Sequence, residues 1–154
     1  SDVCSSDLIA AVASVPASAA STCTVSYSPA VFGNYIPWQS TATDTTGSIQ
    51  VVCSGGLGKI SYVISLGTGG GGTYLARKLK SGPTARLNYN LYLDAARTLI
   101  WGDGTGGIAT VSDSYLAPAI GNTIRSYPVY GRISPLQNVV AGSYTDQLLI
   151  TVNY

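Results

Sequence analysis

The chain has 154 residues and a mass of 15.8 kDa, which is the size of a single domain. Hydrophobic residues make up 45% of it, whereas charged residues make up only 10% and leave a net charge of +1. This balance excludes a nucleic-acid-binding protein, because affinity for phosphates needs a dense basic face. The absence of histidine excludes Ser-His-Asp and Cys-His hydrolases and any histidine-ligated metal site.

Residues 8–20 read LIAAVASVPASAA, a short apolar stretch that runs into small residues. A membrane span needs about 20 apolar residues, so this stretch fits better the end of a secretory signal peptide, with an A-x-A cleavage site at residues 17–19. Residues 1–7 are polar and acidic, and we interpret them as a remnant rather than natural sequence; the alternative is a native tail. We therefore expect residues 1–20 to lie outside the fold and residues 21–154 to form one domain. Because the chain has no methionine, we also expect its natural start to be missing.

Two cysteines, Cys23 and Cys53, lie in the predicted domain, while Cys4 lies in the leader. An even pair in an exported chain predicts one disulfide, formed in an oxidising compartment. Two cysteines without a histidine make a poor metal site, and the C-x-x-C spacing of redox motifs is missing. The sequence therefore predicts a structural disulfide and no bound metal or cofactor.

Apolar and polar residues alternate along most of the predicted domain, and no stretch shows a helical stripe. The alternation predicts strands at residues 23–27, 49–53, 60–66, 87–93, 108–111, 124–133 and 148–154. Clusters rich in glycine and small polar residues predict turns at residues 44–47, 67–72, 80–83, 102–107 and 141–143. About seven short strands separated by such turns are typical of an all-β, antiparallel β-sandwich.

The last predicted strand runs to the final residue of the sequence. Its apolar side chains on one face are Leu148, Ile150, Val152 and Tyr154. An amphipathic strand with nothing after it could lack the partner that covers its far edge, and exposed edges usually pair with something. An ordinary edge strand of a complete sandwich explains the pattern equally well.

Three stretches resemble the spore coat protein U domain family, which includes subunits of archaic chaperone–usher pili. They are CTVSYSPAVFGNYIP, followed by GSIQVVC; LNYNLYLDAARTLIWGDGTGG; and YPVYGRISPLQNVVAGSYTDQLLITVNY. The resemblance covers residues 21–154, and its most specific parts are the runs LYxDxxRxxxWGDG and GSYxDxLxxTVxY.

This resemblance implies an immunoglobulin-like sandwich that lacks its last strand and is completed by donor-strand exchange. It further implies export to the periplasm, a chaperone that lends a strand, an outer-membrane usher, and other pilus subunits that replace the lent strand. Leu148, Ile150, Val152 and Tyr154 would then line or border the acceptor groove. The expected function is a structural subunit of a surface pilus or coat that supports adhesion and biofilm formation.

After cleavage near Ala19 or Ala20, only two or three residues would precede Cys23, whereas a donor strand needs about five. The chain is thus expected to accept a strand but not to donate one. Three roles stay open: a terminal or tip-associated subunit, a coat-type surface protein, and a shaft subunit whose natural amino terminus is missing.

A monomeric module that binds a surface or carbohydrate is the alternative function, since the chain has 11 tyrosines and two tryptophans, Trp38 and Trp101. Core packing explains most of these aromatic residues. The basic residues Arg77, Lys78, Lys80 and Arg86 are interpreted as a solvated loop.

An enzyme is not expected. Asp94 and Asp146 lie in turn-like settings, where aspartate closes turns through backbone contacts, and no acid–base pair is evident. Asp103 stands nearly alone in a Gly-rich hairpin turn, whereas calcium needs six to eight oxygen ligands. The glycines at residues 69–72 lack the pattern of a phosphate-binding loop, so they predict a flexible loop.

Overall fold

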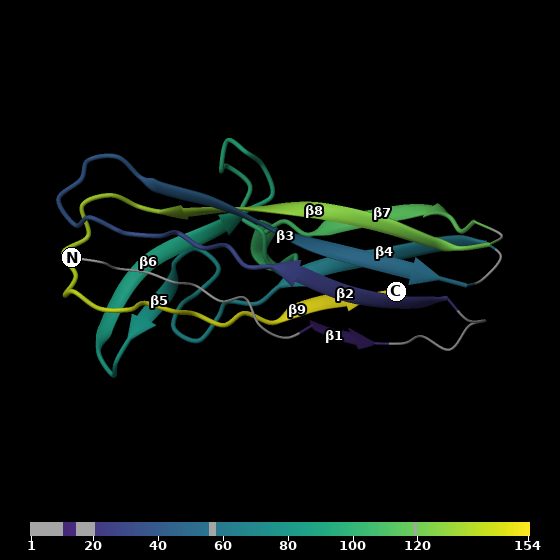
Figure 1. The fold of residues 1–154 in the computed structure, drawn as a ribbon, viewed down its shortest axis with the longest axis horizontal. Coiled ribbons are helices and arrows are strands. Elements are labelled where there is room, and N and C mark those ends of the chain that lie inside the picture. The colour runs from purple at the N-terminus through teal and green to yellow at the C-terminus, as the bar shows by residue number, and fades with distance from the viewer. Residues whose placement is uncertain (1–10, 15–20, 56–57, 119) are drawn as a thin grey trace.

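The computed structural model describes residues 11–14, 21–55, 58–118 and 120–154, and it forms two packed β-sheets (Figure 1). One sheet has the strand order β1-β9-β4-β7 and the other β2-β3-β8-β6-β5. The strands are β1 (Ala11–Ser14), β2 (Thr22–Ser28), β3 (Thr43–Ser54), β4 (Lys59–Leu66), β5 (Arg77–Ser81), β6 (Ala85–Tyr92), β7 (Val111–Leu116), β8 (Asn122–Ile133) and β9 (Ile150–Asn153). The predicted all-β sandwich is confirmed, and a single 3₁₀ turn, Thr105–Gly107, is its helical element in the described ranges. None of the described helices is long and apolar enough to cross a bilayer.

The core lies between the two sheets and is built from the alternating side chains of their strands. In β4, every second residue is buried, as the sequence pattern predicts. Ile49, Val51 and Cys53 in β3 and Leu87, Tyr89 and Leu91 in β6 are buried in the same alternation, although Asn90 of β6 is buried as well. Because successive side chains of a strand point to opposite faces, a period of two places one apolar set in the core.

Cys23 and Cys53 form the predicted disulfide. The two residues lie directly opposite one another in the antiparallel β2–β3 pair. Both are nearly inaccessible to solvent, so the bond joins the edge strand β2 to β3 from within the core. It closes a loop between residues 30 positions apart in the sequence.

The turn predicted at residues 44–47 is wrong, since these residues lie inside β3. β3 pairs with β8 along its entire length, from Thr43 to Ser54. Gly47 is a glycine because the chain after β2 crosses it closely: a Cβ atom there would lie 2.7 Å from the Ser28 carbonyl oxygen. The strand predicted at residues 108–111 is also shifted, because β7 begins at Val111.

The chain between β6 and β7 joins the two sheets through Trp101. The Trp101 backbone N–H donates to the Leu91 carbonyl in one sheet, and the carbonyl of Gly102 accepts from Leu66 N–H in the other. The buried indole Nε1 donates to the Ile64 carbonyl at 3.1 Å. The WGDG run is thus a structural connection between the layers.

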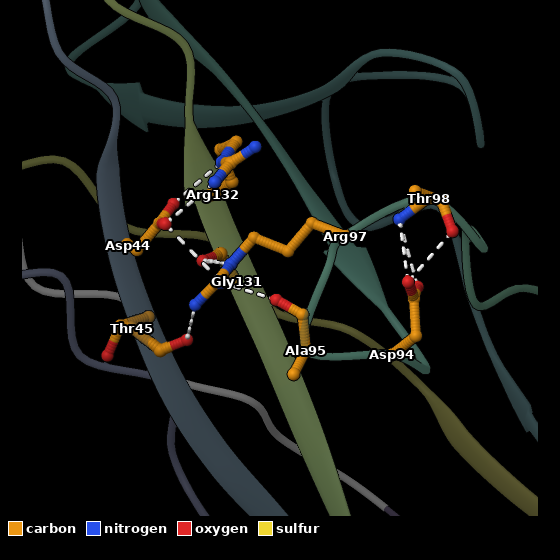
Figure 2. Close-up of polar contacts among 8 residues, drawn as sticks. All are labelled: Asp44, Thr45, Asp94, Ala95, Arg97, Thr98, Gly131 and Arg132. Carbon is orange, nitrogen blue, oxygen red and sulfur yellow. Dashed lines mark hydrogen bonds and ion pairs between the residues drawn. The ribbon is translucent and has the colours of Figure 1, made fainter.

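Arg97, from the same connection, reaches a cluster of charges at one end of the β3–β8 pair (Figure 2). Arg97 Nε donates to the Gly131 carbonyl at 3.1 Å, and its Nη1 lies 3.3 Å from the Asp44 carboxylate. Arg132 binds the same carboxylate with two hydrogen bonds of 2.7 and 2.8 Å. The Arg132 hydrogen bond lowers the pKa of Asp44, so the carboxylate is ionised at neutral pH.

Asp94 closes the turn that leads to Arg97, as the sequence predicts. Its carboxylate accepts hydrogen bonds from the N–H groups of Thr98 and Leu99 at 2.8 to 3.1 Å (Figure 2 shows Thr98). Asp103 likewise accepts from the N–H and hydroxyl of Thr105, although the loop is a 3₁₀ turn rather than a hairpin. Both carboxylates therefore stabilise their loops by accepting hydrogen bonds from backbone N–H groups.

Replacing both Cys23 and Cys53 by serine should lower the free energy of unfolding by about 3–4 kcal/mol, because the unfolded chain regains the freedom of a loop of about 30 residues. Urea unfolding followed by tryptophan fluorescence measures the difference. Cys4→Ser in both proteins keeps the comparison free of other thiols. A loss below about 1 kcal/mol would show that β2 is held by its hydrogen bonds alone.

Candidate strand-accepting edge

Every second side chain from residue 144 to residue 152 is buried, and those between are exposed or half-buried, although only Ile150–Asn153 form a regular strand. Of the four residues predicted to border a groove, Leu148, Ile150 and Val152 are buried in the core, and Tyr154 is half-buried against it. All four therefore lie on the inward face of the final segment. β9 pairs with β4 on one side, which leaves its other edge facing the side of the sandwich.

That edge of β9 pairs with β1 (Figure 1, purple beside yellow). The two strands run parallel, with Ala11 opposite Ile150 and Ser14 opposite Asn153. This corrects the expectation that residues 1–20 lie wholly outside the fold: four of them form a strand of the sheet, and the remainder fall outside the described residues. The sequence pattern of small apolar residues indicated a signal peptide, and nothing in it pointed to a strand partner.

β1 also approaches β2, the end strand of the other sheet. The edge of β9 and the edge of β2 thus lie on the same side of the sandwich. We call this the β1–β2 side. β1 closes this side of the sandwich, because it pairs with β9 and lies close to β2.

The segment before β9 crosses from one sheet to the other. Thr145 first pairs with Lys80 at the outer edge of β5, through backbone hydrogen bonds of 2.8 and 2.9 Å. Four residues later, the Leu149 carbonyl accepts from Gly67 N–H, at the end of β4. This crossing segment positions β9 beside β4.

Asp146 holds this crossing in place. It is only 4% exposed, and its carboxylate accepts from the Tyr89 hydroxyl at 2.7 Å and from Gly70 N–H at 2.8 Å. The Gly-rich loop is therefore tied down rather than free, and Gly69 shows why glycine is needed: a Cβ there would lie 2.0 Å from Asp146 Oδ2. The expectation of a turn-closing aspartate missed these partners, because two of them are more than 50 residues away in the sequence.

Arg77 is a buried structural residue, and its prediction as part of a solvated loop is wrong. It lies in β5 with 0% exposure. Its guanidinium donates to the carbonyls of Gly67 and Trp101 and to Asn90 Oδ1 at 2.6 to 3.0 Å. Burial lowers the pKa of Arg77, although an arginine so bonded stays protonated. The other three basic residues of this run are half-buried on β5 and β6.

The aromatic residues mostly belong to the core, as expected. Tyr35, Tyr62, Tyr89 and Tyr144 are buried, and so is Trp101. The exposed ones are Trp38, with 75% exposure in the loop before β3, and Tyr27 in β2, with 39%. Among the described residues, no three His, Cys, Asp or Glu side chains are grouped so that they could hold a metal ion.

Arg77→Met should lower the free energy of unfolding by about 3 kcal/mol, because the carbonyls of Gly67 and Trp101 lose their Arg77 donor and Asn90 Oδ1 keeps only the Leu91 N–H. Lys78→Met is the matched control on the same strand, and it should change the stability by less than about 0.5 kcal/mol. Urea denaturation measures both. Equal effects would show that the buried hydrogen bonds of Arg77 contribute nothing beyond an ordinary strand residue.

Comparison with known proteins identifies the family of this chain. The family model of the Spore Coat Protein U domain matches residues 9–151, a range that includes β1 and the first two residues of β9. Protein U of Myxococcus xanthus is 31% identical over 117 residues, which are 71% of this chain and 59% of that protein. The chain thus spans less than two thirds of the length of this curated relative. On the family match, which covers nearly the whole sandwich, the chain belongs to the Spore Coat Protein U domain family.

Proposed function

We propose that this chain is a structural subunit of a surface pilus or coat and that it is assembled by strand addition at β9. Membership of the Spore Coat Protein U domain family supports a structural role at the cell surface, because the family includes pilus and coat subunits. The pairing of Ala11–Ser14 with Ile150–Asn153 supports the more specific proposal of strand addition at β9. A segment distant in sequence supplies the strand that this edge needs.

The edge of β9 needs a strand for a physical reason. Without a partner there, the backbone N–H and C=O groups of β9 that point away from β4 would have only water to bond, and each sheet hydrogen bond contributes about 0.5–1.5 kcal/mol. The inward side chains Ile150 and Val152 would also come closer to solvent. A strand from another chain meets both needs, since its main chain gives affinity and its alternating side chains give register.

The partners that fit this proposal are a periplasmic chaperone, an outer-membrane usher and other subunits that contribute strands. The buried Cys23–Cys53 disulfide supports export, because such bonds persist in oxidising compartments. Adhesion and biofilm formation are the functions that we propose for the assembled structure. The terminal, coat and shaft roles share the strand-accepting edge and differ in whether the chain also donates a strand.

Proline in β1 should open the β9 edge. Successive N–H groups of a strand point to opposite sides, so the adjacent substitutions Val12→Pro and Ala13→Pro remove one N–H that faces β9. We expect this variant to form multimers and to bind a peptide of residues 8–17, which returns it to a monomer. Sedimentation velocity and fluorescence anisotropy of the labelled peptide measure the two effects.

The matched control carries Ser5→Pro and Ser6→Pro, outside the bounds of β1, and should behave as the unmodified chain. A proline variant that stays monomeric and does not bind the peptide would contradict a strand-accepting edge at β9.

Polymerisation can be tested directly on material sheared from the surface of the organism that makes the protein. On an SDS gel without boiling, an immunoblot should show a ladder of regular multiples or one heavier band that collapses to the monomer after boiling. The physical reason is that SDS must break the pairing of a whole buried strand to separate such subunits.

A ladder indicates a shaft subunit, and a single heavier band indicates a terminal subunit. A monomer band before and after boiling would contradict the pilus proposal and leave the coat protein and the monomeric binding module as the alternatives.

A further inference from the structure

The sandwich has a second open side, opposite β1 and β2. β7 is the end strand of its sheet, with no described strand beyond it. β8 pairs with β6 only at residues 130–133, so residues 122–129 have one edge without a described strand. Side-chain contacts join these two edges, and Figure 1 shows β7 beside β8. We call this the β7–β8 side.

A carboxylate from the edge strand points inward on this side. Along β7, Val111, Asp113 and Tyr115 are half-buried, whereas Ser112, Ser114 and Leu116 are exposed. Asp113 therefore lies on the core face of an edge strand, where an apolar residue would be expected. An inward-pointing charge is one of the devices by which edge strands avoid pairing with other chains.

Asp113 is held by partners from the facing sheet. The Tyr127 hydroxyl donates to Asp113 Oδ2 at 2.5 Å, and the Tyr62 hydroxyl lies 2.5 Å from that of Tyr127. Arg125 Nε is 3.8 Å from the same carboxylate oxygen, and its guanidinium lies over the Tyr115 ring. The hydrogen bond from Tyr127 lowers the pKa of Asp113, so the carboxylate is charged at neutral pH.

Both charges of this pair still reach water. The Asp113 side chain is 23% exposed and that of Arg125 is 46% exposed. A strand that paired with β7 or with residues 122–129 would cover them and remove this water without supplying new partners. Removing water from charges is unfavourable unless new hydrogen bonds replace it.

Pro128 adds a second obstacle on the same side. It lies within the stretch of β8 that lacks a described partner on one edge, opposite Ser48 of β3 on the other. Proline has no N–H to donate, and in strands it is found where its nitrogen faces an unpaired edge. A strand added to β8 would meet a missing donor there.

We propose that Asp113, Arg125 and Pro128 keep the β7–β8 side closed to strand addition and thereby direct assembly to the β1–β2 side. This inference rests on the proposed function, since it explains why one side of the sandwich accepts a strand and the other does not. The three residues are specificity determinants: they act by making the wrong pairing unfavourable.

The test removes the charge pair from the full chain with Asp113→Val and Arg125→Val together, so that neither charge is left unpaired. Hydrogen exchange measured by mass spectrometry should then show exchange at residues 111–116 slowed about tenfold or more as the protein concentration rises. Sedimentation velocity should show the accompanying dimers. Unmodified protein should show neither change.

The matched control carries Ser112→Val and Ser114→Val, which add two valines to the outward face of the same strand and leave the charges in place. It should keep fast exchange at every concentration. Asp113→Asn with Arg125→Gln removes the same two charges at nearly the same side-chain volume, should slow exchange at residues 111–116 in the same concentration-dependent way, and carries the test should the valine variant not fold. Adding Pro128→Thr, which restores an N–H, should extend the slowing to residues 122–129.

Fast exchange at all concentrations in the folded variants would overturn the proposal, as would equal slowing in the serine control. Exchange at residues 150–153 is recorded in the same experiment. If β9 does not accept a strand, the peptide-binding assay and the exchange at residues 150–153 will show it. If the β7–β8 side is not kept closed by these residues, only the exchange at residues 111–116 and 122–129 will show it.

Discussion

The pairing of β3 with β8 over twelve residues is the interaction on which the remaining structure depends. Each of the two strands has twelve residues, and the neighbouring strands of their sheet attach to this pair. β2 joins β3 through the disulfide, and β6 joins β8 at its far end. The Asp44–Arg132 pair braces one end of this ladder, and the Asp113–Tyr127 contact ties its middle to the facing sheet.

The two sheets are held in register by a few buried polar groups as well as by apolar packing. Trp101, Arg77 and Asp146 bond to backbone groups where the chain passes from one sheet to the other. A buried polar atom is costly unless it is bonded, so each of these side chains permits only one arrangement of the crossing segments. Apolar packing alone would tolerate several arrangements. Hydrogen bonds made outside β9, such as those of Asp146 just before it, therefore help to specify the position of β9 beside β4.

The two open sides of the sandwich differ in chemistry. On the β1–β2 side, the edge of β9 presents backbone groups above apolar inward side chains, and a strand pairs with it. On the β7–β8 side, a charged pair and a proline lie where an added strand would pack. On the proposed function, assembly in one direction would need both features, because an edge that attracts the right strand also attracts wrong ones.

The sequence by itself determined the fold class, most of the strands and the disulfide, since these depend on alternation with a period of two and on two inward cysteines. It also indicated the inward face of the last strand, Leu148, Ile150, Val152 and Tyr154. Only the tertiary structure decided what pairs with that strand, that Arg77 is buried, and that Gly47 lies within a strand. The physical reason is that these features depend on contacts between segments 10 to 139 residues apart, such as Arg77 with Gly67 and Ala11 with Ile150, and local patterns carry no information about such distant partners.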